Sequence, residues 1–258
     1  MLSPFTMLQR ARAWFYRLRM KARGIQQVSD DYRLLKAGQP LTAEGWKVPS
    51  AAAWQHREFE RLLGDVRSGN PRIDFQIAAE AIKATGHDNP RIIEVGCGSG
   101  YYSEALSLLL GRRIRYVGID FSPAMVSLAR AKFDEGEFLA GDACHLPLRN
   151  ECCDILLNGT SIMHIANYRA AIAESVRTSR EWCIFHTVPL VARRETTIMH
   201  KLAYGQRVVE VVFNQTEFES MLSESGLVIN RTFQSIPYDV SEILNEPSWT
   251  VTYLCRKR

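Results

Sequence analysis

Several patterns that would identify a class of protein at once are missing from this chain of 258 residues. Its six cysteines include no pair in Cys-x-x-Cys spacing, which argues against a zinc site and against the disulfide framework of a secreted protein. No apolar run reaches about 18 residues, so we expect no transmembrane helix. An internal repeat and a low-complexity tract are also absent. We therefore expect a globular cytoplasmic protein with reduced thiols and without a bound metal.

A large excess of one charge is missing too. The 32 basic and 28 acidic residues leave a net charge of +4, short of the concentrated basic face of a dedicated nucleic-acid-binding protein. The composition, 46% hydrophobic and 23% charged, is ordinary for a soluble globular chain. The length suits one large α/β domain, or a core domain with a cap.

Residues 4–23 depart from this balance. Their apolar positions step by three and four, which predicts an amphipathic helix whose polar face is basic, with Arg10, Arg12, Arg17, Arg19, Lys21 and Arg23. The segment lacks the continuous apolar region and the cleavage site of a signal peptide. Three interpretations remain open: a flexible arm, a cap helix lying on the core, or peripheral attachment to the anionic inner face of a membrane.

The pattern along the chain predicts two parts, an N-terminal helical arm and cap over residues 1–88 and a second domain over residues 89–258. Ser50 is the expected N-cap of a helix in the first part. From residue 91 onward strands and helices alternate, which predicts a doubly wound parallel α/β sheet. The expected strands cover residues 91–95, 114–120, 137–141, 153–158 and 181–188.

This alternation stops in the last third of the chain. Residues 187–213 predict an irregular insertion with one short helix. A capping box, Thr216 with Glu219, predicts the start of a further helix that ends at Gly226. Two strands at the edge of the sheet then close the chain.

The stretch "IIEVGCGSGYYSEAL", residues 92–106, runs from an apolar strand through a glycine turn into a helix. The dinucleotide-binding fingerprint G-x-G-x-x-G would need a glycine at Tyr101 or Ser103, and neither fits. The turn instead has Glu94 at the strand end, followed by Gly96, Cys97, Gly98 and Gly100. An acid there repels a pyrophosphate and attracts an ammonium group, so the turn predicts a cationic ligand.

Two more acids follow the next strands. Asp120 comes twenty residues after Gly100, where a carboxylate can accept hydrogen bonds from ribose hydroxyls, a feature shared with nicotinamide-binding folds. Asp142 follows the third strand, where it can accept from an adenine amine with the Ala143 N–H near a ring nitrogen, or merely cap its own turn. With Glu94, all three acids stand at the ligand-binding edge of the predicted sheet.

The segments "EVGCGSG", "VGIDFSPAMVSLAR", "FLAGDACHLPLRNECCDILLNGTSIMHI" and "FESMLSESGL" resemble the class I S-adenosylmethionine-dependent methyltransferases, over roughly residues 88–258. The resemblance implies a seven-stranded sheet whose last strand is antiparallel, and S-adenosylmethionine as the cofactor. It implies that Glu94 and the glycine turn hold the methionine part and Asp120 the ribose. It further implies that Phe121, Asp142 and Ala143 surround the adenine and that Asn158 lies near the methionine.

Methyl transfer from a sulfonium mainly requires alignment and the exclusion of water, and a hydroxyl acceptor needs a base as well. His164 follows the fourth strand and resembles the catalytic histidine of some small-molecule O-methyltransferases, although a packing role is open. His186, at the end of the fifth strand, has the same two interpretations. Residues of the 187–213 insertion, where this fold builds acceptor specificity, are the candidate acceptor contacts: Arg193, His200 and Tyr204. Arg193 and its neighbour Arg194 either bind a phosphate or carboxylate or form a solvated pair.

The acceptor is expected to be a small molecule or a carbohydrate-linked group, methylated on oxygen rather than nitrogen. "NGTSIM" stands where enzymes that methylate base amines often have N/D-P-P-Y/F, which disfavours RNA. Trp46, Trp54 and Gln55 are expected to form a lid with the insertion. A scaffold that binds the cofactor without turnover and a nicotinamide-dependent oxidoreductase are the alternatives, and the oligomeric state stays open.

Overall fold

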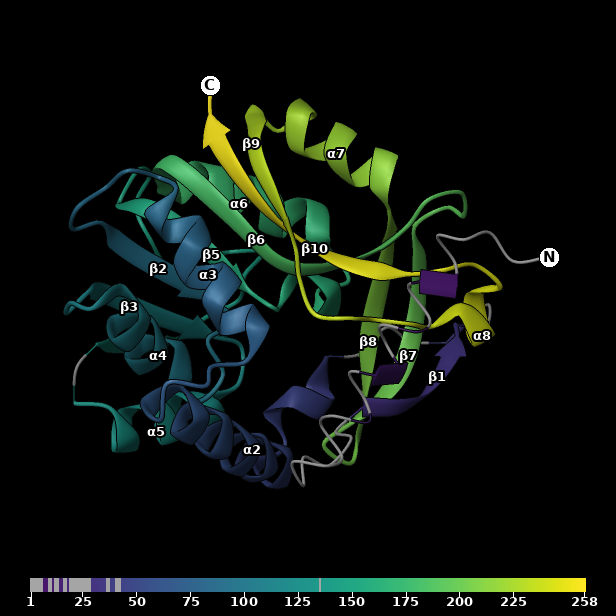
Figure 1. The fold of residues 1–258 in the computed structure, drawn as a ribbon, viewed down its shortest axis with the longest axis horizontal. Coiled ribbons are helices and arrows are strands. Elements are labelled where there is room, and N and C mark those ends of the chain that lie inside the picture. The colour runs from purple at the N-terminus through teal and green to yellow at the C-terminus, as the bar shows by residue number, and fades with distance from the viewer. Residues whose placement is uncertain are drawn as a thin grey trace.

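The computed structural model describes residues 7–8, 11, 14–15, 18, 29–35, 38–39, 43–134 and 136–258. Its core is a sheet with the strand order β4-β3-β2-β5-β6-β10-β9 (Figure 1). The five neighbouring strands β4, β3, β2, β5 and β6 are parallel to one another. The strand β10 runs antiparallel to both of its neighbours, β6 and β9. The predicted antiparallel last strand is confirmed, whereas the whole sheet in the described part of the chain has ten strands in place of the predicted seven, because β8 also pairs with β6. The core strands named above are β2 (Arg91–Val95), β3 (Arg115–Asp120), β4 (Glu137–Ala140), β5 (Cys153–Gly159), β6 (Ser179–Val191), β9 (Leu227–Gln234) and β10 (Trp249–Lys257).

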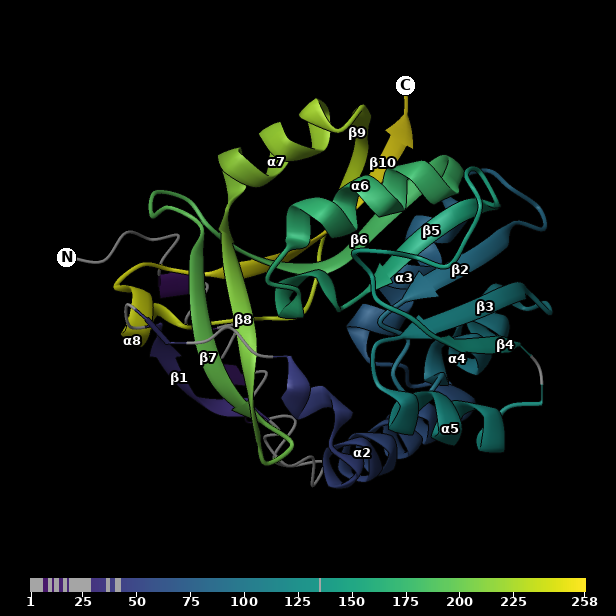
Figure 2. The same ribbon diagram turned by 180° about the vertical axis from the view of Figure 1, so that it is seen from behind.

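Helices cover both faces of this sheet (Figures 1 and 2). Successive strand residues point to opposite faces, so Ile92 packs in one core cluster and Ile93 in the other. The first cluster is completed from α2 (Pro49–Arg67), α3 (Ile73–Lys83), α4 (Tyr101–Leu110) and α5 (Pro123–Lys132). The second is completed from α6 (Tyr168–Thr178) and α7 (Gln215–Glu224). The helices α2 and α3 belong to the segment before residue 88. Because they share a core with the sheet, this segment packs against the part of the chain that carries the candidate site. The division of the chain near residue 88 stays a prediction.

The 187–213 segment is not an irregular insertion with a helix, and that prediction is wrong. The end of β6, then β7 (Thr197–Ala203) and β8 (Gln206–Asn214), occupy it, and β7 pairs antiparallel with β8 and with β1 (Ser29–Leu34). This β1-β7-β8 layer stands beside the core sheet, joined through β8 and β6 (Figure 2). Residues 208–212, four valines around Glu210, are buried on both faces, so they lack the alternation that marks a half-exposed strand.

Two of the expected helix caps are also wrong. The helix α2 begins at Pro49 after Val48, because proline suits the first helical position, and Ser50 is not its cap. The helix α7 is capped by Asn214, whose side chain accepts from the Glu217 N–H, in place of Thr216. Two short 3₁₀ helices, η1 (Glu44–Lys47) and η2 (Ile162–His164), and the helix α8 (Ser241–Leu244) complete the described elements.

Of the predicted N-terminal helix, the described residues are helical, and the six basic residues of that segment lie outside the described part of the chain. Within the described ranges, no helix is both long and apolar enough to span a membrane.

Candidate functional site

The glycine turn between β2 and α4 requires glycine for conformation and for space. Gly96, Gly98 and Gly100 have φ values of +75°, +54° and +83°, in the region that side chains disfavour. A Cβ on Gly96 would lie 2.2 Å from Ser161 Cβ, and one on Gly98 would lie 2.7 Å from Gln55 Oε1. The N–H groups of Gly96 and Cys97 both donate to the carbonyl of Ile119, which fastens the turn to β3. The turn is therefore a rigid cradle with a side chain of α2 above it.

Glu94 ends β2 beneath this turn as a fully buried carboxylate. The Tyr116 hydroxyl donates to its Oε2 atom, whereas Oε1 has no hydrogen-bond partner among the described residues. Burial raises the pKa of Glu94 to about 8, against the lowering effect of the Tyr116 hydrogen bond, and nearby Asp120 raises it further. A buried, unpartnered oxygen is costly, so the geometry fits a ligand that brings a positive donor to it. The ammonium group of a bound methionine moiety is such a donor.

Asp120, at the end of β3, is hydrogen-bonded to the glycine turn. Its two oxygens accept from the N–H groups of Gly98 at 2.7 Å and Ser122 at 2.8 Å. Burial raises the pKa of Asp120, and these two backbone hydrogen bonds oppose the rise. Each carboxylate oxygen retains a further lone pair, so the group can also accept from ribose hydroxyls.

The next position along the edge, Phe121, is covered from the N-terminal segment. The ammonium group of Lys47 lies 3.9 Å from the centre of the Phe121 ring, and it also pairs with Glu44 at 3.1 Å. The helix η1 thus lies over the ring that is expected to pack on the adenine.

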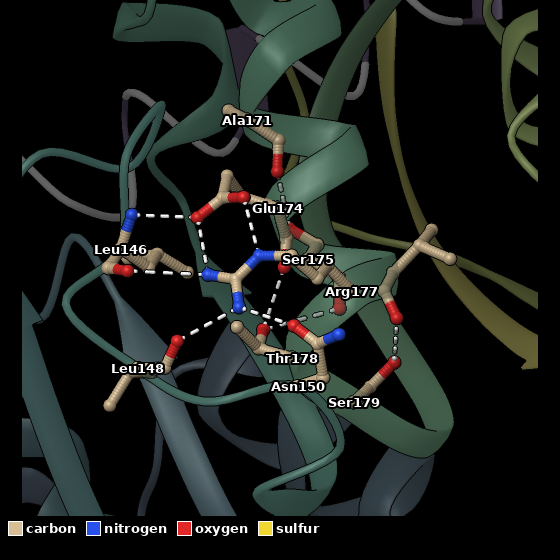
Figure 3. A network of polar contacts seen from close by, with 10 residues as sticks. Leu146, Leu148, Asn150, Ala171, Glu174, Ser175, Arg177, Thr178 and Ser179 are labelled. Atoms are coloured by element: carbon tan, nitrogen blue, oxygen red, sulfur yellow. Dashed lines mark hydrogen bonds and ion pairs between the residues drawn. The ribbon is translucent and has the colours of Figure 1, made fainter.

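Asp142 accepts from the Cys144 N–H at 2.8 Å, so it caps its own turn, which is the alternative that the sequence left open. The loop that carries Asp142 and Ala143 is anchored further along by Arg177 of α6 (Figure 3). The Arg177 guanidinium donates to the carbonyls of Leu148 and Leu146 and to both oxygens of Glu174. This places the Asp142 loop firmly at the sheet edge. The adenine contacts of Asp142 and Ala143 stay a prediction.

Asn158 uses its side chain inside the protein. Its Nδ2 donates to Ser175 Oγ at 3.0 Å, and its Oδ1 lies 3.1 Å from Ser161 Oγ. The Ser161 hydroxyl also lies 2.8 Å from the Val95 carbonyl, directly beneath Gly96. Asn158 therefore supports the floor of the glycine turn, and its expected contact with the methionine moiety stays a prediction.

His164, in η2, is oriented by two acceptors. Its Nδ1 lies 3.0 Å from the Val209 carbonyl oxygen and 3.2 Å from Glu210 Oε2. Because both are acceptors, Nδ1 carries the proton and Nε2 keeps a lone pair. Burial, followed by the charge of Lys201, lowers the pKa of His164 to about 4, so the ring is neutral near pH 7. The Nε2 lone pair can accept a proton, but a pKa this far below 7 makes the ring a weak base, and the catalytic role of His164 stays a prediction.

His186, in β6, is arranged differently. Its Nε2 lies 2.9 Å from the Tyr102 hydroxyl and its Nδ1 lies 2.8 Å from Thr252 Oγ1. The residue is fully buried, and burial lowers its pKa to about 4. Both ring nitrogens are engaged within the protein, so neither is left for a substrate proton.

An aromatic cluster from two distant parts of the chain meets at His164. The Trp46 ring centre lies 4.9 Å from that of His164 and 6.0 Å from that of Tyr204. Tyr204, in the β7–β8 turn, also lies 6.1 Å from Trp54 of α2. The N-terminal segment and the β7–β8 hairpin thus meet here, as the lid hypothesis expects.

Of the other two candidate acceptor contacts, Arg193 lies apart from this cluster and His200 is buried opposite Val209. Arg193 is in the loop before β7, at the opposite end of that strand from Tyr204, about 20 Å away at the usual rise per residue. Its side chain is 82% exposed and lies 3.7 Å from Glu246. His200 is buried in the middle of β7, and its Nε2 has no partner among the described residues. The structure therefore brings Tyr204 to His164 but not Arg193.

Three residues near the site were not predicted as site residues. Tyr116 and Glu210 contact the two groups that matter most, Glu94 and His164, and Lys201 pairs with Glu210 at 2.8 Å. One signal existed in the sequence: Glu210 is a single acid inside the apolar run of residues 208–213, and a buried charge requires a partner. Tyr116 carried no comparable signal.

Comparison with known proteins agrees with this geometry. A family described as a methyltransferase domain matches residues 93–184. The chain is 28% identical over 173 residues to a malonyl-[acyl-carrier protein] O-methyltransferase of Serratia marcescens, covering 66% of this chain and 60% of that protein. It is 27% identical over 132 residues to a demethylmenaquinone methyltransferase of Oceanobacillus iheyensis, covering 47% and 56%. The chain thus spans less than two thirds of the length of these relatives.

Solved structures show the same fold. A 1,6-didemethyltoxoflavin-N1-methyltransferase of Burkholderia thailandensis, with bound S-adenosylhomocysteine, aligns with a TM-score of 0.54 at 12% identity, over 88% of this chain and 99% of that one. A TehB-like S-adenosylmethionine-dependent methyltransferase of Corynebacterium glutamicum aligns with a TM-score of 0.55 at 16% identity, over 82% and 100%.

The fold is that of S-adenosylmethionine-dependent methyltransferases of known structure, and the glycine turn lies in the part of the chain that matches a methyltransferase domain. S-adenosylmethionine is the cofactor of this class. Residues 93–184, which include the glycine turn, Asp120 and His164, are the part that matches the methyltransferase domain.

Proposed function

We propose that this protein transfers a methyl group from S-adenosylmethionine to an oxygen atom of a small-molecule acceptor. The observation that carries the proposal is the orientation of His164, whose Nδ1 faces the Val209 carbonyl and Glu210 and whose Nε2 has no hydrogen-bond partner among the described residues. Two relatives are named for acceptors, a malonyl-[acyl-carrier protein] and demethylmenaquinone, and of these two only the first is named as an O-methyltransferase. Nothing among the described contacts favours a carbohydrate-linked acceptor over other small molecules.

In this proposal, the chain's residues hold the cofactor in three places. Glu94 Oε1 accepts from the ammonium of the methionine part, and the turn from Gly96 to Gly100 allows its close approach. Asp120 accepts from the ribose hydroxyls, while Phe121 and the Asp142 loop enclose the adenine. When bound, the cofactor supplies a methyl group already activated by the positive sulfur.

His164 then acts as the base. Its Nε2 would take the proton of the acceptor hydroxyl as that oxygen bonds to the methyl carbon, while the bond from this carbon to sulfur breaks and the neutral thioether S-adenosylhomocysteine leaves. The positive charge that develops on the imidazole lies 3.2 Å from Glu210, which stabilises it and holds the ring in place. Trp46, Trp54 and Tyr204 exclude water and present apolar faces, so they favour an acceptor with an aromatic or apolar part.

The alternatives lack a comparable observation. A scaffold without turnover does not explain why a buried imidazole is held with one nitrogen free. A nicotinamide-dependent oxidoreductase is disfavoured, because residues 93–184 match a methyltransferase domain and an acid at Glu94 repels a pyrophosphate.

Calorimetric titration with S-adenosylhomocysteine, with NADH in parallel, tests the cofactor part of the proposal. We expect binding of the first alone. Transfer of labelled methyl from S-adenosylmethionine to a panel of carboxylic acids, phenols, hydroquinones and amines tests the acceptor. Products from oxygen acceptors only are expected. Exclusive methylation of amines would overturn the assignment of oxygen, and a folded protein that fails to bind S-adenosylhomocysteine would overturn the cofactor site.

A further inference from the structure

The described part of the N-terminal helix exposes large apolar side chains. Met7, Leu8, Trp14, Phe15 and Leu18 are helical, with 61%, 57%, 54%, 65% and 45% of their surface accessible. They make up five of the nine strongly exposed large apolar residues in the described ranges. Isolated exposed apolar residues are normal, but a cluster of them marks an interaction surface.

These side chains share one face of the helix. At about 100° per residue, Met7, Leu8, Ala11, Trp14, Phe15 and Leu18 fall within an arc of about 120°. A helix that caps its own core buries such a face. Here the face is open, so the cap interpretation does not hold for these residues.

The charge of the segment indicates what would cover this face. Residues 1–24 contain six basic and no acidic residues, whereas the rest of the chain contains 26 basic and 28 acidic residues. The sequence spacing predicts three basic residues on each side of the apolar arc: Arg12, Arg19 and Arg23 on one side, Arg10, Arg17 and Lys21 on the other. An apolar face bordered by cations, with a tryptophan in it, complements a surface that is anionic outside and apolar beneath.

We propose that the helix containing Met7 to Leu18 binds the surface of a bilayer that contains anionic phospholipids. Leu8, Trp14, Phe15 and Leu18 enter the boundary between headgroups and acyl chains, and the flanking cations pair with lipid phosphates. Neither the cofactor nor the acceptor enters this inference, so it stands or fails separately from the proposed function.

Flotation of the full chain with vesicles provides the test. Vesicles of phosphatidylcholine alone are compared with vesicles of phosphatidylcholine mixed with phosphatidylglycerol. We expect a preference for the anionic vesicles of about tenfold or more, which falls as salt is added. Equal binding to both vesicles, or no binding to either, would overturn the proposal.

Two variants make the test specific to this face. The double variant Trp14→Glu/Phe15→Glu is expected to lose vesicle binding while it binds S-adenosylhomocysteine as the native chain does. The control is Leu108→Glu, which places one of the two added negative charges on a 48% exposed apolar residue of α4 and is expected to leave vesicle binding unchanged. Native-like vesicle binding by the double variant would overturn the proposal. So would a homodimer that dissociates in the double variant and binds no vesicles, since the face would then cover a second copy of the chain.

Discussion

The Nδ1 atom of His164 lies 3.2 Å from Oε2 of Glu210, although the two residues are 46 positions apart in the chain. The same nitrogen faces the Val209 carbonyl, so the β7–β8 hairpin alone decides which ring nitrogen carries the proton. His186 has no such asymmetry, because Tyr102 and Thr252 occupy its two nitrogens. The base of the proposed reaction therefore depends on a hairpin outside the core sheet.

Replacing His164 by Ala removes the proton acceptor without touching the glycine turn. We expect kcat to fall by about 10²–10⁴-fold while the affinity for S-adenosylhomocysteine is unchanged. His186→Asn is the comparison, because it breaks buried hydrogen bonds and is expected to lower the melting temperature with a much smaller effect on kcat. Steady-state kinetics and thermal unfolding measure both. A native kcat in the His164→Ala variant would show that another residue is the base.

The buried pair of Glu210 and Lys201 allows a separate test of stability and activity. Glu210→Gln leaves Lys201 without its partner, so we expect a loss of about 3–5 kcal/mol in the free energy of unfolding. The double variant Glu210→Gln/Lys201→Met removes both charges and is expected to recover most of that loss. Its kcat should stay at least about tenfold below native, because His164 still lacks the carboxylate. Full recovery of kcat would show that Glu210 only pairs with Lys201 and does not assist His164.

A substitution at Gly98 tests whether the glycine turn holds the cofactor. Gly98→Ala imposes a side chain at φ +54° and 2.7 Å from Gln55 Oε1, so we expect S-adenosylhomocysteine binding to weaken by at least about tenfold. Gly64→Ala in α2 is the control, because a Cβ there meets nothing within 4 Å and binding should be native. Adding Gln55→Ala to Gly98→Ala removes the contact and not the strain, so only part of the affinity should return. Native affinity in Gly98→Ala would place the ligand away from the turn.

The raised pKa of Glu94 predicts that binding of the cofactor releases a proton from its carboxyl group. Its pKa of about 8 keeps the carboxyl mostly protonated near pH 7, and an ammonium group at Oε1 favours the ionised form. Binding of S-adenosylhomocysteine should therefore tighten as the pH rises toward 8. Titration calorimetry in buffers of different ionisation enthalpy, at pH 7, should detect release of up to one proton. In Glu94→Gln the release should vanish, with affinity about 10–100-fold weaker. A native proton release in that variant would move the effect to another group.

The same groups predict how the stability of the cofactor-free protein varies with pH. His164 and His186 have folded pKa values of about 4, so below pH 6.5 the unfolded chain takes up protons that the folded protein excludes, and stability falls toward pH 5. Glu94 acts oppositely, since the folded protein keeps a proton that the unfolded chain has lost, and stability falls as the pH rises toward 8.

Below pH 6.5 the effect of the two histidines on the free energy of unfolding is larger than that of Glu94. Above pH 6.5 only Glu94 makes this free energy depend on pH. Their joint contribution should therefore peak near pH 6.5 and decline by on the order of 1–2 kcal/mol on each side. Urea unfolding at three pH values measures this. Glu94→Gln should abolish the decline on the alkaline side, and a native decline in that variant would contradict the sign worked out for Glu94.

Local pattern was enough to predict the core of the fold. Strands such as β2 and β3 and the glycine turn each depend on a few neighbouring residues, whose spacing can be counted in the sequence. The β1-β7-β8 layer was missed because burial on both faces removes the alternation by which a strand is found. For the same reason the position of Arg193, at the far end of β7, could not be predicted.

The sequence by itself determined the parallel core strands, the acidic edge with its three carboxylates and the expectation of a cationic ligand, because these follow from backbone conformation and charge at short range. Only the tertiary structure decided which histidine has a free nitrogen, since that depends on partners brought from β8 and β10. It also decided that Tyr116 leaves one oxygen of Glu94 unpartnered and that the apolar face of the N-terminal helix is exposed. Contacts between residues distant in the chain form only when burial brings them together, and no local pattern encodes them.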